Sequence, residues 1–179
     1  MIYLILIGVV ALAASGTLFV SGRGLVRDIS DVREIVGRVK RVNVRAFRQL
    51  QDPRDVEFLR NQLNASAFRT SQRLRARAEL SYLVAIFQNA AILARVAELA
   101  RATGQAELVE AGTRLLNAAM QVRVYSGTAI LGALIRCCWP LGAGSDEIVI
   151  GKYEDLRDRV AAVALLQCPA ESSAVCSAV

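Results

Sequence analysis

The sequence predicts an all-α protein with a single N-terminal transmembrane helix, a coiled-coil-like stalk and a helical bundle of about four helices. Its 179 residues include only three prolines, and 54% are hydrophobic, against roughly 45–50% in ordinary soluble domains. Apolar positions also recur at helical spacing through most of the chain. We therefore expect four consecutive parts: a transmembrane anchor over 1–22, a basic amphipathic heptad helix over 23–51, a helical bundle domain over 52–167 and a flexible tail over 168–179.

The predicted anchor rests on residues 2–20, which carry no charge. As a helix this run would measure about 28 Å, close to the ~30 Å hydrocarbon core of a bilayer. A cleaved signal peptide is the alternative, but it would normally show basic residues before the apolar run and a cleavage site after it. No basic residue precedes the run, and Ala11-Leu12-Ala13 lies inside it. The pattern favours an anchor that is kept.

Basic residues beside the anchor predict its orientation. Residues 21–80 contain 14 basic and 7 acidic side chains, whereas residues 81–179 contain 8 and 9. Basic residues close to a span resist translocation. Six follow the apolar run closely: Arg23, Arg27, Arg33, Arg38, Lys40 and Arg41. We therefore expect a single-pass protein of the cell membrane, with its N-terminus outside and its C-terminal domain in the cytoplasm.

Gly8, Ala11 and Ser15 place small side chains on one face of the predicted anchor. Such a face lets a second transmembrane helix approach closely. An alanine-rich chain also produces this spacing by chance, so the sequence leaves both interpretations open.

The segment after the anchor has heptad spacing, with Ile29, Val36, Asn43 and Leu50 at the a positions. β-Branched residues at a, with one asparagine among them, favour a parallel two-stranded coiled coil. The seam is short, however, and neighbouring apolar positions widen the face enough to suit packing on helices of the same chain. A homodimer seam and intramolecular packing both remain open.

Capping residues divide the predicted bundle domain. Asp52 and Pro53 predict the N-cap and first residue of a new helix. Residues 80–100 are apolar on nearly all sides and predict the buried central helix, since their polar residues disfavour a membrane span. Gly104 predicts a turn, and a further helix is expected over 105–138.

The two halves of the helix over 105–138 differ in polarity. The first half carries a polar stripe formed by Glu110, Arg114, Asn117 and Gln121. Residues 124–135 carry no charge. This run is short for a span and suits a core helix, with an interfacial or re-entrant segment as the alternative. A loop with a short extended piece over 148–150 and a final amphipathic helix over 153–166 complete the predicted domain.

Arg69, Arg73 and Arg77 lie four residues apart, on one face of a predicted helix. This spacing favours contact with anionic lipid or another polyanion. Nucleic acid is the weaker choice because no aromatic residues are interleaved to stack on bases. The alternative is a solvated helix face with a local ion pair such as Arg75 to Glu79.

The sequence lacks the patterns of common catalytic and metal sites. It contains no histidine, which removes the commonest general base and metal ligand. Residues 142–144 are glycine-rich but are not followed by the lysine of a phosphate-binding loop. Zinc sites of the Cys-x2-Cys type are not matched by the four cysteines: Cys137, Cys138, Cys168 and Cys176. We expect no catalytic residue, no cofactor and no bound metal.

These observations predict a non-catalytic scaffold or accessory subunit of a larger membrane protein assembly. The alternative function is a membrane-surface binding module that uses the three arginines to hold anionic lipid or another polyanion. The expected partners are membrane lipid and either a membrane protein or a second copy of the chain, and nucleic acid is not expected.

Overall fold

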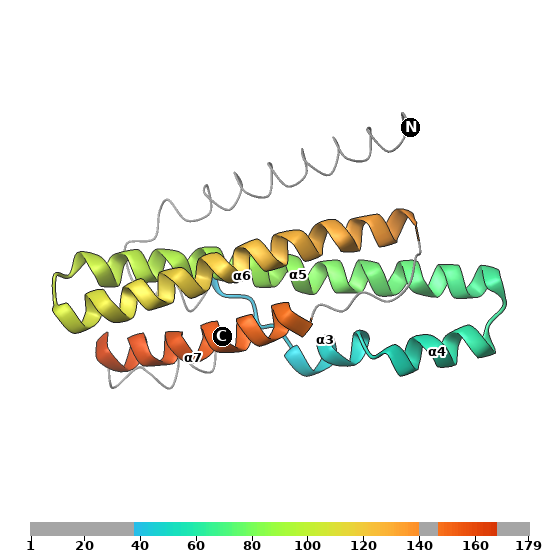
Figure 1. Cartoon of the computed structure of the whole chain (residues 1–179), viewed down its shortest axis with the longest axis horizontal. Coiled ribbons are helices and arrows are strands. Elements are labelled where there is room, and N and C mark those ends of the chain that lie inside the picture. The colour runs from blue at the N-terminus through green and yellow to red at the C-terminus, as the bar shows by residue number, and fades with distance from the viewer. Residues whose placement is uncertain (1–37, 140–146, 168–179) are drawn as a thin grey trace, which may run out of the picture.

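The computed structural model describes residues 38–139 and 147–167 (Figure 1). Over these ranges the chain forms five helices and no strand: α3 (Val44–Leu50), α4 (Pro53–Gln62), α5 (Ala65–Ala102), α6 (Ala106–Cys138) and α7 (Glu147–Gln167). The all-α prediction is confirmed for this part of the chain. The predicted anchor over 1–22, the first part of the heptad helix and the tail over 168–179 lie outside the described residues.

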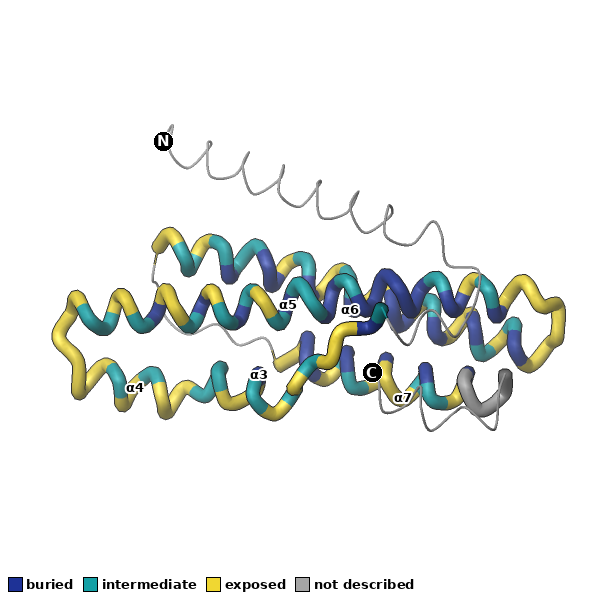
Figure 2. Tube along the Cα trace, turned by 180° about the vertical axis from the view of Figure 1, so that it is seen from behind, coloured by how far each residue is buried: buried dark blue, intermediate teal, exposed yellow. Residues whose placement is uncertain are grey.

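The two longest helices, α5 and α6, form an antiparallel pair along the whole length of the bundle (Figure 1). A second layer packs against this pair. In that layer α7 and the α3–α4 segment follow one another lengthwise, α7 against α6 and α4 against α5. Most buried residues lie where α5 and α6 pass α7, whereas α4 has none (Figure 2).

The α5–α6 hairpin forms because the predicted turn closes as expected. Helix α5 ends at Ala102, and Gly104 has a φ of +76°, a conformation that glycine adopts without steric cost. The two helices then approach closely at Gly112, where an added Cβ would lie 2.9 Å from the Ala97 carbonyl oxygen. A side chain at this position would hold the helices apart.

The buried central helix is also confirmed. Leu83, Ile86 and Leu93 of α5 are at most 1% exposed, and they form the middle of a core in which α5 and α6 face each other. Phe47 of α3 is fully buried and stacks on Tyr82 of α5, with ring centroids 5.3 Å apart. The bundle therefore begins before residue 52, the predicted boundary.

Polar side chains cap the shorter helices. The carboxylate of Asp52 accepts a hydrogen bond from the Arg54 N–H at 2.9 Å, which confirms the predicted start of α4 at Pro53. Asn64 caps α5 by accepting from the Ala67 N–H at 2.8 Å. The break at 63–64 separates α4 from α5 within a run that contains neither glycine nor proline.

The heptad helix predicted over 23–51 is wrong at residues 39–43, which are not helical. Asn43, predicted to occupy an a position, is the exposed N-cap of α3, and its side chain accepts from the Ala46 N–H at 3.0 Å. The physical reason is a competing interaction. The Lys40 N–H donates to the Asn89 side chain, and the Lys40 carbonyl accepts from it. These two backbone groups therefore do not take part in a helix.

The extended piece predicted over 148–150 is also wrong, because these residues form the first turn of α7. The β-branched residues at 148–150 suit a strand locally. Val149 and Ile150 are nevertheless buried, and the same face of α7 continues at helical spacing with Tyr153 and Leu156. Packing of this face against the bundle outweighs the local preference.

Candidate functional site

The second half of α6 presents an apolar side to solvent, which we call the α6 outer face. Its residues recur at helical spacing and end at the C-cap of the helix: Met120, Val124, Leu131, Ile135 and Trp139. Val124 is 62% exposed, Ile135 47% and Trp139 63%. A run of exposed apolar side chains on one face is a candidate contact surface, whereas single exposed residues need no explanation.

The α6 outer face carries no charged residue because the two arginines in this part of the helix are turned towards α5. The Arg123 guanidinium lies 4.9 Å from the centre of the Phe87 ring. Arg136 forms a 2.7 Å ion pair with Glu79. The charge-free run over 124–135, predicted as a core helix or an interfacial or re-entrant segment, has a buried inner side, whereas Val124 and Ile135 on its outer side are exposed.

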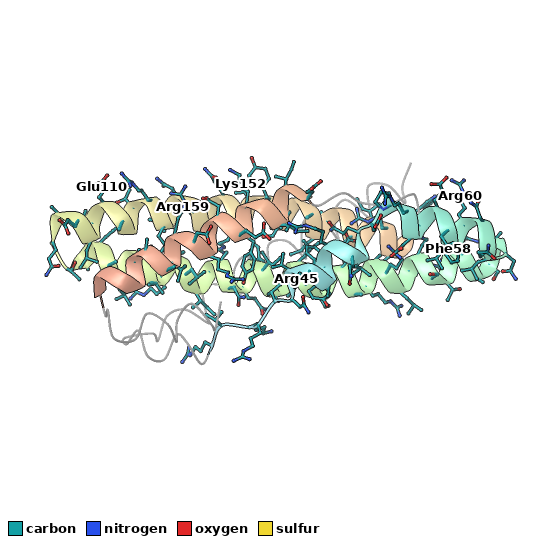
Figure 3. The ribbon with its side chains drawn as sticks, turned by 90° about the horizontal axis from the view of Figure 1, so that it is seen from below. Arg45, Phe58, Arg60, Glu110, Lys152 and Arg159 are labelled. Atoms are coloured by element: carbon teal, nitrogen blue, oxygen red, sulfur yellow. The ribbon has the colours of Figure 1, made fainter. Side chains whose placement is uncertain are left out.

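Helix α7 lies beside the first half of α6 (Figure 1). The predicted polar stripe is confirmed there, with all four members exposed: Glu110, Arg114, Asn117 and Gln121. Gln121 accepts a hydrogen bond from Lys152 of α7 at 3.1 Å. The charged side chains labelled in Figure 3 project from α3, α4, α6 and α7.

The three predicted arginines share an exposed face of α5, which we call the arginine face: Arg69, Arg73 and Arg77. Arg69 donates from Nε to the Ala65 carbonyl at 3.1 Å. Arg73 and Arg77 follow on exposed positions one and two turns further along α5.

The local ion pair considered from the sequence, Arg75 to Glu79, is not formed. Glu79 pairs with Arg136 instead, with side chains 8% and 17% exposed, and also accepts from Gln51 Nε2 at 3.3 Å. Arg75 donates to the Leu50 carbonyl at 2.6 Å. The Glu79–Arg136 pair joins α5 to α6, and the Arg75 hydrogen bond joins α5 to α3. Both interactions therefore stabilise the packing of the bundle.

A second buried polar cluster centres on Asn89. The Asn89 Oδ1 accepts from the Lys40 N–H at 2.9 Å, while Nδ2 donates to the Lys40 carbonyl at 2.7 Å and to the Tyr153 hydroxyl at 2.9 Å. Asn89 and Tyr153 are fully buried. Every polar atom of the amide is used, so the cluster holds three segments together and leaves no group free for a ligand.

The two cysteines at the end of α6 are free thiols, Cys137 half-buried and Cys138 exposed. Burial raises the pKa of the Cys137 thiol, and Arg77 opposes this shift. Among the residues that the structure describes, no group of three or more Cys, Asp or Glu side chains could hold a metal ion.

The structure describes only part of the predicted packing face and heptad seam. Gly8, Ala11 and Ser15 of the predicted packing face, and Ile29 and Val36 of the predicted seam, lie outside the described residues. Leu50, the last seam position, is the half-buried final residue of α3.

From the sequence, residues 124–135 were open to an interfacial interpretation, but the members of the α6 outer face were not singled out. Its signal was present, because Val124 and Ile135 lie on the same side of the helix as Asn117 in the polar stripe. A helix whose outer side changes from polar to apolar along its length indicates that its polar part faces water and its apolar part contacts another molecule.

Within the described ranges two helices, α5 and α6, are long and apolar enough to cross a membrane. In the most apolar stretch of α5, 67% of the residues are buried inside the bundle, against 33% in α6. Burial in the core accounts for the apolar character of α5. Burial accounts for only part of the apolar character of α6. No family model matches the chain, and no curated protein or solved structure is significantly similar to it.

Proposed function

We propose that this chain is a non-catalytic, membrane-anchored helical protein that acts as a scaffold or accessory subunit of a larger membrane protein assembly. The observation that carries the proposal is the α6 outer face, an uncharged apolar side on a helix whose opposite side is buried in the core. Uncovered apolar faces of this kind are typical of surfaces that contact other molecules.

The apolar run over 2–20 supports a membrane location for that contact. In this proposal the run is a single-pass anchor, with the N-terminus outside and the bundle in the cytoplasm, because the basic flank follows it. A reporter that is active only outside the cytoplasm, fused after Val179, should therefore be inactive, and a matched fusion before Met1 should be active.

A second candidate function is a membrane-surface binding module. It is favoured by the arginine face, whose members Arg69, Arg73 and Arg77 are exposed on α5. Anionic headgroups attract such clusters. The two functions differ in the surface that makes the contact: the α6 outer face binds a protein in the first, and the arginine face binds anionic lipid or another polyanion in the second.

Photo-crosslinking in native membranes tests the proposal. A photoreactive residue at Val124, on the α6 outer face, should crosslink to one defined protein, and a matched probe at the exposed Asp158 of α7 should not. The same partner should then co-purify with the full chain in mild detergent. A chain that stays a lone monomer, with no product specific to Val124, would contradict the scaffold role.

A further inference from the structure

We propose that the α6 outer face binds a second copy of this chain, with the two α6 helices packed side by side in antiparallel orientation. This inference rests on the protein contact proposed above for the same face. It adds the identity of that protein, the residues that meet and their register.

A heptad pattern runs along the exposed side of the second half of α6. Its positions are separated by alternating steps of three and four residues, and we call them the α6 seam: Gln121, Val124, Thr128, Leu131, Ile135 and Cys138. Five of these residues are exposed and Leu131 is half-buried. Steps of three and four keep one side of a helix facing a second helix along its length. The α6 seam therefore fits a helical partner.

The spacing of the α6 seam is the same in both directions along the helix. Its steps are three, four, three, four and three residues. In an antiparallel pair, Val124 of one copy therefore lies level with Ile135 of the other, and Thr128 lies level with Leu131. The more polar ends of the seam form the outermost layers, within reach of water. A two-fold interface uses the same patch on both copies, and this pattern meets that requirement.

Charge selects the antiparallel orientation. The heptad positions continue towards the start of α6 at Arg114 and Glu110, which are exposed and pair with each other. In a parallel pair each of these charges would face the same charge of the other copy, and like charges across an interface weaken it. In the antiparallel pair the helices overlap over the uncharged α6 seam, and both residues lie beyond it.

Two glycines flank the middle of the α6 seam, and the packing of the chain itself requires neither. A Cβ at Gly127 would have no neighbour closer than 3.9 Å. At Gly132 its nearest neighbour would be the end of the Arg136 side chain, at 3.3 Å. Glycine inside a helix lowers the stability of the helix relative to alanine. A second helix that approaches the seam closely makes use of the missing side chains.

The size of the surface suits a pair of copies. Four members of the α6 outer face are 44–63% exposed: Met120, Val124, Ile135 and Trp139. Covering their exposed parts in both copies would bury about 1,000 Å², the size at which specific interfaces begin. The α6 outer face carries no charge, so two copies can meet without burying a charge that has no partner.

Cysteine crosslinking tests the partner and the orientation together. Two full-length chains with different tags, whose four native cysteines are replaced by serine, are co-expressed, one with Val124→Cys and the other with Ile135→Cys. Mild oxidation of the isolated membranes should join these two chains, because the two positions are level in the pair. Two Val124→Cys chains should stay separate, since their cysteines would lie about 16 Å apart along the helices, beyond the reach of a disulfide.

Sedimentation of the full chain in mild detergent gives a second measurement. The chain should form a reversible dimer. Val124→Glu combined with Ile135→Glu should raise the Kd of the dimer more than about a hundredfold, because the interface would bury carboxylates without partners. Phe58→Glu is the matched control and should leave the Kd unchanged, since Phe58 is 63% exposed on α4, which packs on α5. Circular dichroism should show the same helix content in each variant, because all three positions are exposed.

Each other occupant of the α6 outer face gives a different result. If the photoreactive probe at Val124 crosslinks to an unrelated protein and the cysteine pair stays unjoined, the second copy is wrong and the proposed protein contact stands. If the probe links only to lipid, only to residues 23–37 of its own chain or to nothing, the protein contact is wrong and the dimer with it.

Two results would overturn the arrangement even if a dimer forms. Efficient joining of two Val124→Cys chains would show that the helices are parallel. A dimer that persists in the variant with both glutamates would show that the copies meet through another surface.

Discussion

Asn89 of α5 donates a hydrogen bond of 2.9 Å to the hydroxyl of Tyr153 of α7, and both side chains are fully buried. The same amide forms hydrogen bonds with the backbone N–H and the carbonyl of Lys40. Three segments that are distant in the sequence therefore depend on one side chain. Buried polar groups without partners are costly, which makes this cluster sensitive to substitution.

Replacing Asn89 by alanine should lower the free energy of unfolding by about 3 kcal/mol, because three hydrogen bonds are lost and the buried Tyr153 hydroxyl loses the donor that Asn89 supplies. Urea unfolding in mild detergent, followed by circular dichroism, measures this change. Asn117→Ala is the control, since Asn117 is exposed on α6, and should change stability by less than about 0.5 kcal/mol. Similar losses for both variants would argue against the cluster.

Alkaline pH should destabilise the fold through Tyr153. Burial raises the pKa of Tyr153 above its usual value, although the Asn89 hydrogen bond and Arg157 oppose the shift. The unfolded chain therefore loses this proton first, near pH 10. The stability from Tyr153 is fully present below about pH 10 and declines above it, by at most about 1.4 kcal/mol per pH unit, until the folded pKa is reached.

The Tyr153→Phe variant separates this effect from other alkaline effects. It should be less stable at pH 8, because an Asn89 N–H loses its acceptor, but its stability should fall less steeply between pH 10 and 11.5. Urea midpoints over this range give both slopes. Parallel slopes in the two proteins would show that Tyr153 does not cause the loss.

Glu79→Ala should cost about 3 kcal/mol, because the pair with Arg136 is nearly buried and its arginine would keep a charge there without this carboxylate. Glu110→Ala is the matched control. Glu110 pairs with Arg114 on the exposed side of the same bundle, and such surface pairs contribute less than about 1 kcal/mol. Thermal unfolding of both variants compares the two sites, and equal shifts would contradict the buried role of Glu79.

Two helical glycines should respond to alanine with opposite signs. At Gly112 a new Cβ would lie 2.9 Å from the Ala97 carbonyl oxygen, a backbone atom that cannot move without separating α5 from α6. We expect a loss of about 1–3 kcal/mol there. At Gly151 nothing lies within 4 Å, so the higher helix propensity of alanine should stabilise α7 by about 0.5–1 kcal/mol. Melting temperatures that move in the same direction would contradict this account.

Local signals predicted part of this fold. The N-cap at Asp52 and the turn at Gly104 follow from side-chain chemistry within a few residues, and the structure confirms both. The buried central helix was predicted from its composition for a similar reason. Periodicity and capping act over short distances, so a single sequence contains them in full.

Long-range contacts explain the errors. The heptad pattern through Asn43 gave no indication that Asn89, 46 positions later, would hold the backbone of Lys40 and stop the helix. The partner of Glu79 was likewise sought one turn away at Arg75, but lies on α6. The arginine face was predicted as a shared face because its members are close in sequence, and their exposure on one side of α5 is confirmed.

The hold of Asn89 on Lys40 also determines how the bundle would carry a mechanical load. Tension applied through residues before 38 reaches the described fold at Val39 and Lys40, ahead of α3. Lys40 passes it to the longest helix through two hydrogen bonds. The short helices α3 and α4 follow this point in the chain and would carry less of the load, so the bundle would resist a pull applied from its N-terminal side.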